Sequence, residues 1–449
     1  MNPLPDDYIF IIFVYGKINI KFVSTSSGSD GDEIVKSVWT TGTKINVVIF
    51  LVTTTEGCIR LLFPPFFSSL GFHSSTIGYM FSLLAIATLT SRLPGGLWYA
   101  LKRRRLLLNL TVFLLAGTAC FLALPLSMTA VIITLAGHGI CFGIVTTLLL
   151  AFCIDNIDNK QSPVGAMALY TAFIAGGYAT GNMVAGLFAS YLGISATFWV
   201  AGIFTYCALI LLLTVRWPGI KFSKEYSNIS DNSKNDFLLL RIWNSVKMAA
   251  GLPLGVYVAF VLVFYINFVN QLVDVYFPLL AMQAGLTLSV IGILQGFKAW
   301  CATLIRFGSG FVLHKISYPL ANNYSLMALA VAASLLAKSL WLPVLIGIFI
   351  TMGLGRGVIR VTSAIFLAEC HFDSSRQKGV ASGVYNAGLD LGDILGPVVA
   401  GATISFWGLT GVFLVLPGLL LIPCYLLVLR VAGISGKIRN CKKDYSNDW

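Results

Sequence analysis

Long apolar stretches recur along almost the whole chain, from residue 44 to residue 430, and short charged or turn-forming segments separate them. A helix that crosses a bilayer needs about 20 apolar residues in succession. Charged residues make up only 11% of the chain, against roughly 25% in soluble globular proteins, so a water-facing surface cannot be covered. The sequence therefore predicts a membrane protein that crosses the bilayer many times. It argues against a soluble enzyme, a disordered protein or a nucleic-acid binder, in spite of the net charge of +12.

The breaks between the apolar stretches predict twelve membrane-spanning helices. The expected helices are 44–69, 74–100, 104–125, 129–154, 164–191, 195–216, 250–282, 287–314, 318–339, 341–369, 376–406 and 409–430. A polar linker, 217–249, divides them into two six-helix bundles, 44–216 and 250–430. An N-terminal extension (1–43) and a C-terminal tail (431–449) complete the chain. The expected fold class is an all-α membrane protein.

Positive charges collect on one side of this predicted bundle. Of the 30 Lys and Arg residues, 23 lie in the N-terminal segment, in alternate loops or near the C-terminus, and the opposite loops carry only Lys338. Cytoplasmic loops of membrane proteins hold the excess of Lys and Arg. We therefore expect both termini and the linker in the cytoplasm, and we expect a monomer in the plasma membrane.

An internal repeat relates the two halves. Residues 57–96 align with 271–310 at a shift of 214, and residues 164–193 align with 379–408 at a shift of 215. The two alignments hold nine and ten identities, in which glycines are frequent: Gly71/Gly285, Gly177/Gly392, Gly181/Gly396, Gly186/Gly401 and Gly193/Gly408. Two similarly oriented halves predict a parallel repeat, the architecture of carriers that expose a central site to each side of the membrane in turn.

The helix order, the repeat and the loop charges resemble those of the major facilitator superfamily over residues 44–430. The family's loop signature after the second helix is Gly, three residues, Asp, Arg, one residue, Gly and basic residues. This chain keeps the first Gly and the basic residues, and the second half has a shorter copy. The positions are Gly96, Ala100, Leu101, Arg103, Arg104 and Arg105, then Gly310, His314 and Lys315. Ala100 and Leu101 replace the Asp and the Arg.

The fifth predicted helix resembles the small-residue motif of the drug:proton antiporter branch. Gly177, Gly181 and Gly186 carry the resemblance, although Asn182 replaces the motif's proline. The equivalent helix of the second half keeps a proline, Pro397. The resemblance to this branch favours export of a small organic compound.

Ionisable side chains inside apolar helices are costly to bury, so they are functional candidates. The carboxylates are candidates for proton coupling: Glu56, Asp274, Asp390 and Asp393. Cations and polar groups are candidates for substrate or counter-charge contacts: Arg60, Lys298, Arg356, Arg360, Tyr385 and Asn386. A third group belongs to the gate and the loop motif: Arg92, Gly96, Arg104, Arg105, Arg306 and Gly310. His138 is either a proton site or a hydrogen-bonded core histidine.

The spacing of these charges predicts some of the pairs. Glu56 and Arg60 are four residues apart, as are Arg356 and Arg360, so each pair shares one helix face. Arg60 and Asp274 occupy equivalent repeat positions, and we expect them to pair across the two halves when the outer side closes. The two arginines of the tenth helix repel each other unless an anion or the carboxylates of Asp390 and Asp393 lie between them. The carboxylates could supply this counter-charge permanently, or a proton could displace an arginine from an aspartate in each cycle. The alternative is that these ion pairs only hold helices in register.

These observations predict a secondary transporter that moves a small organic solute by alternating access, coupled to protons or another ion, with export as the favoured direction. The alternative is an uptake symporter or exchanger for an organic anion, which the arginines favour. A membrane sensor is less favoured because no large cytoplasmic domain is present. No enzyme, metal or cofactor is expected, since no Walker motif, catalytic constellation or Cys/His ligand spacing occurs.

Overall fold

The computed structural model describes residues 41–445, apart from 99–102, 125–126, 156–162, 216–250, 313–317, 369 and 371–374. Its helices in chain order are α3 (Thr41–Ser69), α4 (Ser74–Trp98), α5 (Arg104–Phe121), α6 (Met128–Asp155), α7 (Pro163–Leu192), α8 (Ile194–Leu213), α11 (Leu254–Gln283), α12 (Leu288–Val312), α13 (Tyr318–Leu335), α14 (Leu342–Ala368) and α15 (Ser375–Tyr445). The backbone of α15 leaves the helical conformation at Gly408, so this element is two helices that meet there. The described residues therefore form the twelve expected helices.

Ten of these elements contain a stretch that is long and apolar enough to cross a membrane, and the apolar part of α13 is shorter, Leu320–Leu335. Most boundaries agree with the sequence prediction within a few residues. One prediction was wrong: the last helix does not end at residue 430 but continues to Tyr445, into the expected tail. The N-terminal extension and the linker lie almost entirely outside the described residues.

Tight glycine turns confirm the internal repeat. The described glycines with positive φ are Gly71, Gly193, Gly285 and Gly408, at 82°, 85°, 83° and 66°. L-residues rarely adopt this conformation, so only glycine connects the helices there without strain. Gly71 aligns with Gly285, and Gly193 aligns with Gly408, at the shifts that relate the halves. All four turns lie at the same end of the bundle, which we call the closed end.

Glycines of α7 also bring α7 against α3, and those of α15 bring α15 against α11. A methyl group on Gly181 would lie 2.2 Å from the carbonyl oxygen of Thr54, and one on Gly396 would lie 2.8 Å from that of Phe268. Thr54 and Phe268 are themselves equivalent in the repeat. The two halves therefore use the same glycine contacts to pack their first and fifth helices, and close approach of this kind needs small residues.

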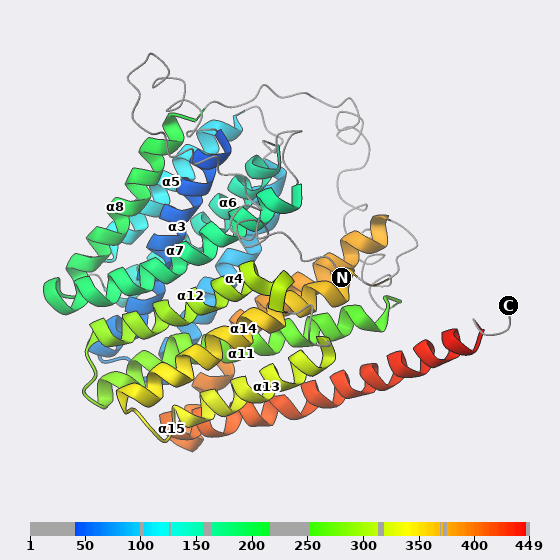
Figure 1. Ribbon diagram of the computed structural model, residues 1–449. Coiled ribbons are helices and arrows are strands. Elements are labelled where there is room, and N and C mark those ends of the chain that lie inside the picture. Colours follow the sequence, from blue (N-terminus) through cyan, green and yellow to red (C-terminus); the bar gives the residue numbers. More distant parts are fainter. Residues whose placement is uncertain are drawn as a thin grey trace, which may run out of the picture.

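The halves contact each other toward the closed end. A methyl group on Gly186 of α7 would lie 2.7 Å from Cα of Gly292 of α12, and the Ser289 backbone N–H donates to Ser190 Oγ at 2.8 Å. On the other flank, Ser82 Oγ of α4 donates to the Ile394 carbonyl oxygen of α15 at 2.7 Å. Figure 1 shows the two groups of helices diverging from there toward the ends where α3 begins and α15 finishes. We call that side the splayed end.

The hydrophobic core follows the same division. Around the closed end one buried cluster includes Phe63 and Phe198 of the first half together with Phe268 and Phe277 of the second. Toward the splayed end the buried apolar residues fall into separate clusters within each half. Exposed large apolar side chains, such as Ile133, cover outer faces of the helices. This distribution fits a bundle that is surrounded by lipid and sealed at one end.

Candidate functional site

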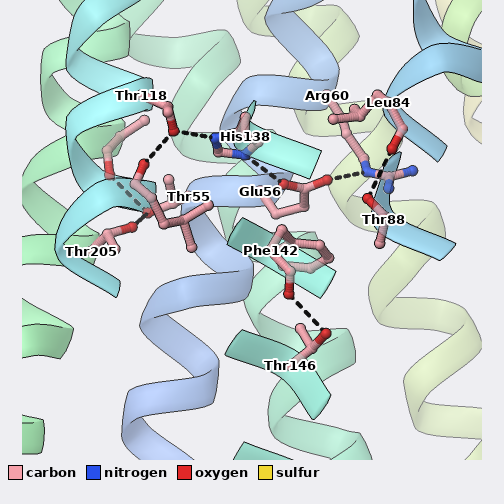
Figure 2. A network of polar contacts seen from close by, with 12 residues as sticks. Thr55, Glu56, Arg60, Leu84, Thr88, Thr118, His138, Phe142, Thr146 and Thr205 are labelled. Carbon is pink, nitrogen blue, oxygen red and sulfur yellow. Dashed lines mark hydrogen bonds and ion pairs between the residues drawn. The ribbon is translucent and has the colours of Figure 1, made fainter. Parts of the chain in front are cut away.

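A polar network crosses the core of the first half (Figure 2). Arg60 Nε donates to Glu56 Oε1 at 2.6 Å, and both side chains come from α3. His138 of α6 places Nε2 3.0 Å from Glu56 Oε2, and its Nδ1 lies 2.9 Å from Thr118 Oγ1 of α5. Glu56 is 1% exposed and His138 is 0% exposed, whereas Arg60 is 20% exposed. Arg60 is thus the member of this chain that reaches out of the core.

The second half carries a matching network. Lys298 Nζ of α12 donates to Asp274 Oδ1 of α11 at 2.5 Å, and the Asn270 amide donates to Asp274 Oδ2 at 2.5 Å. Arg356 Nη1 of α14 donates to Asn270 Oδ1 at 3.1 Å. Lys298 also lies over the Phe349 ring, 5.8 Å from its centroid. The buried ammonium, the carboxylate and the guanidinium are therefore joined through one amide.

The two networks occupy equivalent positions, but their chemistry differs. At a shift of 214, Glu56 aligns with Asn270 and Arg60 aligns with Asp274, and each i,i+4 pair is hydrogen-bonded within its own helix. The expected Arg60–Asp274 pair was wrong for this state of the molecule, since Arg60 binds Glu56 and Asp274 binds Lys298. Residues at equivalent repeat positions lie at the same depth in their own halves. This equivalence does not tell how far apart the two side chains lie across the interface between the halves.

Acidic residues of α15 link the halves instead. Arg92 Nη1 of α4 forms an ion pair with Asp390 Oδ1 at 2.7 Å. The Asp393 carboxylate interacts electrostatically with Arg60 of α3 and with Arg356 of α14. Both aspartates therefore act as counter-charges to an α14 arginine, Asp393 to Arg356 and Asp390 to Arg360, but the hydrogen-bonded partner of Asp390 is Arg92.

An arginine cluster lies in the second half. Arg306 of α12 interacts electrostatically with Arg356 and Arg360 of α14. Arg356 bonds to a neutral amide, and in the part of the chain that the structure describes the Arg360 guanidinium forms no hydrogen bond or ion pair. Like charges held together in this way attract an anion, which a guanidinium binds through paired N–H donors.

The remaining candidates lie apart from this cluster or at its margin. The Tyr385 hydroxyl is 3.3 Å from Ser363 Oγ of α14, close to the arginines, whereas the Asn386 amide donates to its own helix, to the Ser382 carbonyl oxygen. Arg104 pairs with Asp155 at 3.5 Å, and Arg105 donates to the Leu213 carbonyl oxygen at 3.1 Å, at the splayed end. Gly96 and Gly310 lie near the ends of α4 and α12. Ala100, Leu101, His314 and Lys315 are outside the described residues.

Sequence reasoning left out several members of the site. Asn270 is neutral, so a search for buried charges passes over it, although its alignment with Glu56 marks the position. His138 was left open between two roles, and its contact with Glu56 now places it in the network. Thr118 and Tyr178 could not be selected, since hydroxyl groups are common in these helices. The Tyr178 ring lies under Arg60, with its centroid 5.9 Å from the guanidinium carbon.

Two repeated six-helix halves, joined at one end and separated by a charged network, define a membrane transporter of the alternating-access class. Comparison with known proteins agrees: the model of the Major Facilitator Superfamily matches residues 45–375. The chain belongs to this superfamily, and it is a secondary transporter rather than an enzyme. The match does not single out the drug:proton antiporter branch, which stays a prediction.

Similar proteins fall in the same class. The chain is 27% identical over 237 residues to the uncharacterized MFS-type transporter YxaM of Bacillus subtilis (strain 168), a match that spans 47% of this chain and 56% of that relative. Among solved structures it is similar to the nucleoside transporter NupG, with a TM-score of 0.68, 15% identity and coverage of 87% of this chain and 99% of NupG. It is also similar to a bacterial homolog of the human lysosomal transporter Spinster, in an inward-facing conformation. That match has a TM-score of 0.68 and 14% identity, and it covers 90% of this chain and 96% of the homolog. At these identities the structural likeness shows the fold alone.

Proposed function

We propose that this protein is a proton-coupled carrier of a small organic anion. The observation that carries the proposal is the arginine cluster of the second half. Among the described side chains the Arg360 guanidinium forms no hydrogen bond or close ion pair, and the hydrogen bond of Arg356 goes to a neutral amide. A small anion with two or more oxygens would satisfy both guanidinium groups. Tyr385 and Asn270 lie beside them as neutral hydrogen-bonding groups.

The balance of charge inside the bundle supports this substrate class. In the charged networks described above, the cations outnumber the carboxylates by six to four: Arg60, Arg92, Lys298, Arg306, Arg356 and Arg360 against Glu56, Asp274, Asp390 and Asp393. Uncompensated charge in the interior of a membrane protein is expensive. An anionic solute would compensate the surplus, whereas a lipophilic cation would increase it.

Proton coupling follows from competition within the network. Asp393 interacts with both Arg60 and Arg356, so its negative charge opposes the binding of an anion at these arginines. A proton that neutralises a carboxylate of the network frees an arginine for the substrate. Proton and anion then bind together, which is the requirement for symport. Export in exchange for protons is the second candidate, favoured by the small-residue motif of α7, and it requires proton and substrate to compete.

The splayed shape of the bundle indicates to which side of the membrane the site opens. If the charged loops face the cytoplasm, as the positive-inside rule predicts, the splayed end is cytoplasmic and the closed end is extracellular. The structure then corresponds to an inward-open carrier. Its arginine cluster would take up or release the anion on the cytoplasmic side, and rocking of the two halves would expose the cluster to the outside.

A thermal-shift screen of the purified protein tests the substrate class. Mono- and dicarboxylates, phosphates and lipophilic cations would be added to the wild type, to Arg360→Gln and to Arg105→Gln, a control that removes a cation bonded to a carbonyl group away from the site. A ligand that binds the native state at a hundredfold excess over Kd stabilises it by about 2.7 kcal/mol. We expect stabilisation by an anion in the wild type and the control, and its loss in Arg360→Gln. Stabilisation by cations alone would contradict the proposal.

Flux measurements separate symport from exchange. With the anion found in the screen, proteoliposomes with an acidic exterior should accumulate it by symport, and a protonophore should abolish the accumulation. Acidification should also strengthen binding. The export alternative makes the opposite prediction. The anion should bind more weakly at acidic pH, and it should leave preloaded vesicles when the exterior is made acidic, because protons then enter in exchange for it.

A further inference from the structure

His138 and Glu56 form a buried pair whose hydrogen bonds depend on where one hydrogen lies. The Thr118 hydroxyl has a single hydrogen and two neighbours, the Leu115 carbonyl oxygen at 2.8 Å and His138 Nδ1 at 2.9 Å. The carbonyl oxygen can only accept. When the hydroxyl donates to it, the Thr118 oxygen is left to accept, so His138 Nδ1 must carry a hydrogen.

The other ring nitrogen faces an acceptor as well. His138 Nε2 lies 3.0 Å from Glu56 Oε2, and Glu56 Oε1 already accepts from Arg60. A carboxylate and an unprotonated ring nitrogen would both be acceptors, so this contact also needs a hydrogen between them. With Nδ1 and Nε2 both protonated the ring is a cation, and it neutralises Glu56.

We infer that the His138–Glu56 pair holds the coupling proton and that Thr118 is the hydroxyl that lets the pair exist in two states. In the protonated state Thr118 donates to Leu115, and both ring nitrogens donate. In the deprotonated state the hydroxyl turns and donates to Nδ1, while Nε2–H still donates to Glu56. The net change is one N–H bond on the ring, formed with a proton from solvent, and every hydrogen bond of the pair is satisfied in both states.

The two states place different charges beside Arg60. Without the proton the pair carries one negative charge, which holds Arg60 within the first half. With the proton the pair is neutral, and the other carboxylate that interacts with Arg60 is Asp393 of the other half. Proton binding therefore releases Arg60 toward the interface, where it joins the halves through Asp393 or contacts the anion. This inference rests on the proton-coupled function proposed above and assigns the proton to a particular pair.

Few other charged groups face the pair from the elements around it. The neighbours from α3 and α7 are Arg60 and the Tyr178 hydroxyl, whose ring lies under that guanidinium. The described residues of α5 and α8 contribute hydroxyl groups there, Thr118 and Thr205, the second bonded to Thr55 of α3 at 2.7 Å. Arg92 of α4 interacts with Tyr178, and Asp393 of α15 interacts with Tyr178 and Arg60. Imidazole is the side chain that changes charge nearest physiological pH, so His138 is the group in this set suited to exchange a proton.

Nitrogen NMR on the full-length protein in lipid nanodiscs tests the assignment without a ligand. The protein would be labelled with ¹⁵N-histidine, and subtraction of the His138→Gln spectrum would identify the His138 signals. We expect two protonated ring nitrogens at acidic pH, and one protonated nitrogen, Nε2, at alkaline pH. A ring that keeps one unprotonated nitrogen throughout the pH range in which the protein is folded would overturn the inference.

A matched pair of variants examines Thr118. Thr118→Val removes the acceptor of Nδ1–H in the protonated state and the donor to Nδ1 in the neutral state. Because a hydrogen bond from the charged ring is roughly twice as strong as one to the neutral ring, the ratio of protonated to neutral His138 at a given pH should fall severalfold. Thr146→Val removes a hydroxyl of α6 that bonds only to its own helix, at the Phe142 and Gly143 carbonyl oxygens, and should leave the ratio unchanged. Equal ratios in the two variants would contradict the role given to Thr118.

A conformational measurement separates this inference from proton coupling itself. Genetically encoded spin labels at Ile154 of α6 and Ala364 of α14, both exposed near the splayed end, report the distance between the halves. The distance distribution should change between about pH 8 and about pH 5.5, where imidazoles titrate, and His138→Gln should abolish that change. The same change in His138→Gln would overturn the assignment and leave coupling to another carboxylate. An unchanged distance in the wild type would overturn both.

Discussion

The ion pair between Lys298 and Asp274 predicts an asymmetric response to substitution. The Lys298 side chain is 2% exposed, whereas the Asp274 side chain is 30% exposed and keeps a hydrogen bond from Asn270. Asp274→Asn leaves a buried ammonium without a counter-charge. Lys298→Met leaves a carboxylate that is partly hydrated and still hydrogen-bonded. The first change should therefore destabilise the protein much more than the second.

The magnitudes follow from the exposures. Removal of one partner of a fully buried ion pair costs about 3–5 kcal/mol. The lower end, about 3 kcal/mol, applies to Asp274→Asn because the new amide can still accept from Lys298. Lys298→Met should cost about 1 kcal/mol, since hydration and Asn270 support the carboxylate. The double variant should also cost about 1 kcal/mol, because no charge is then left without a partner, and this implies a coupling of about 3 kcal/mol.

The wild type, the two single variants and the double variant form a double-mutant cycle. Equilibrium unfolding in mixed detergent micelles, followed by circular dichroism, would measure the stability of all four proteins. Asp155→Asn is the control, because its carboxylate is 47% exposed and 3.5 Å from Arg104, and it should cost less than about 1 kcal/mol. Equal losses in the two single variants, or a double variant whose loss is their sum, would refute the reasoning from burial.

Two further predictions concern the interface between the halves, and a third concerns packing within the second half. Gly292→Ala should push α7 and α12 apart and shift the protein away from the splayed state in spin-label distances, whereas Gly347→Ala, which meets nothing within 4 Å, should not. Asp390→Asn should weaken the contact of α4 with α15 and change the spin-label distance distribution. The exchanged pair, Arg92→Asp with Asp390→Arg, should restore the wild-type distribution. If it does not, the ion pair does not hold the two helices together. Tyr276→Phe should lower the unfolding free energy by about 1 kcal/mol through loss of its bond to a carbonyl oxygen of α15, and an unchanged value would show that the bond adds nothing.

The helices could be predicted because one physical requirement dominates them. The bilayer demands apolar stretches of a certain length, and the turn glycines at 71, 193, 285 and 408 end those stretches with a conformation that other residues avoid. The error at the C-terminus has the same origin. Beyond residue 430 the composition becomes polar, which ends a membrane span, but it does not end a helix.

The partners within the site were harder to predict. Glu56 and Arg60 pair because four residues of helix bring them to one face, so spacing alone was enough. The choices of Arg92 for Asp390 and of His138 for Glu56 depend on how far each helix is rotated and how closely its neighbours approach. Glycine contacts between helices help to set how closely the helices approach. This information is not available from a single sequence before the packing of its helices is known.

The tight turns of the closed end bear on how the chain enters the membrane during synthesis. The segments of that end must cross the bilayer if the charged loops stay with the ribosome, and each Lys or Arg carried through the hydrocarbon centre costs about 2.5–3.5 kcal/mol. Single glycines make two of these connections, and four-residue segments without Lys, Arg, Asp or Glu, 70–73 and 284–287, make two more. Only Lys338 has to be translocated with a connection. The helix hairpins on either side of each glycine can therefore insert as pairs, with almost no charge to carry across.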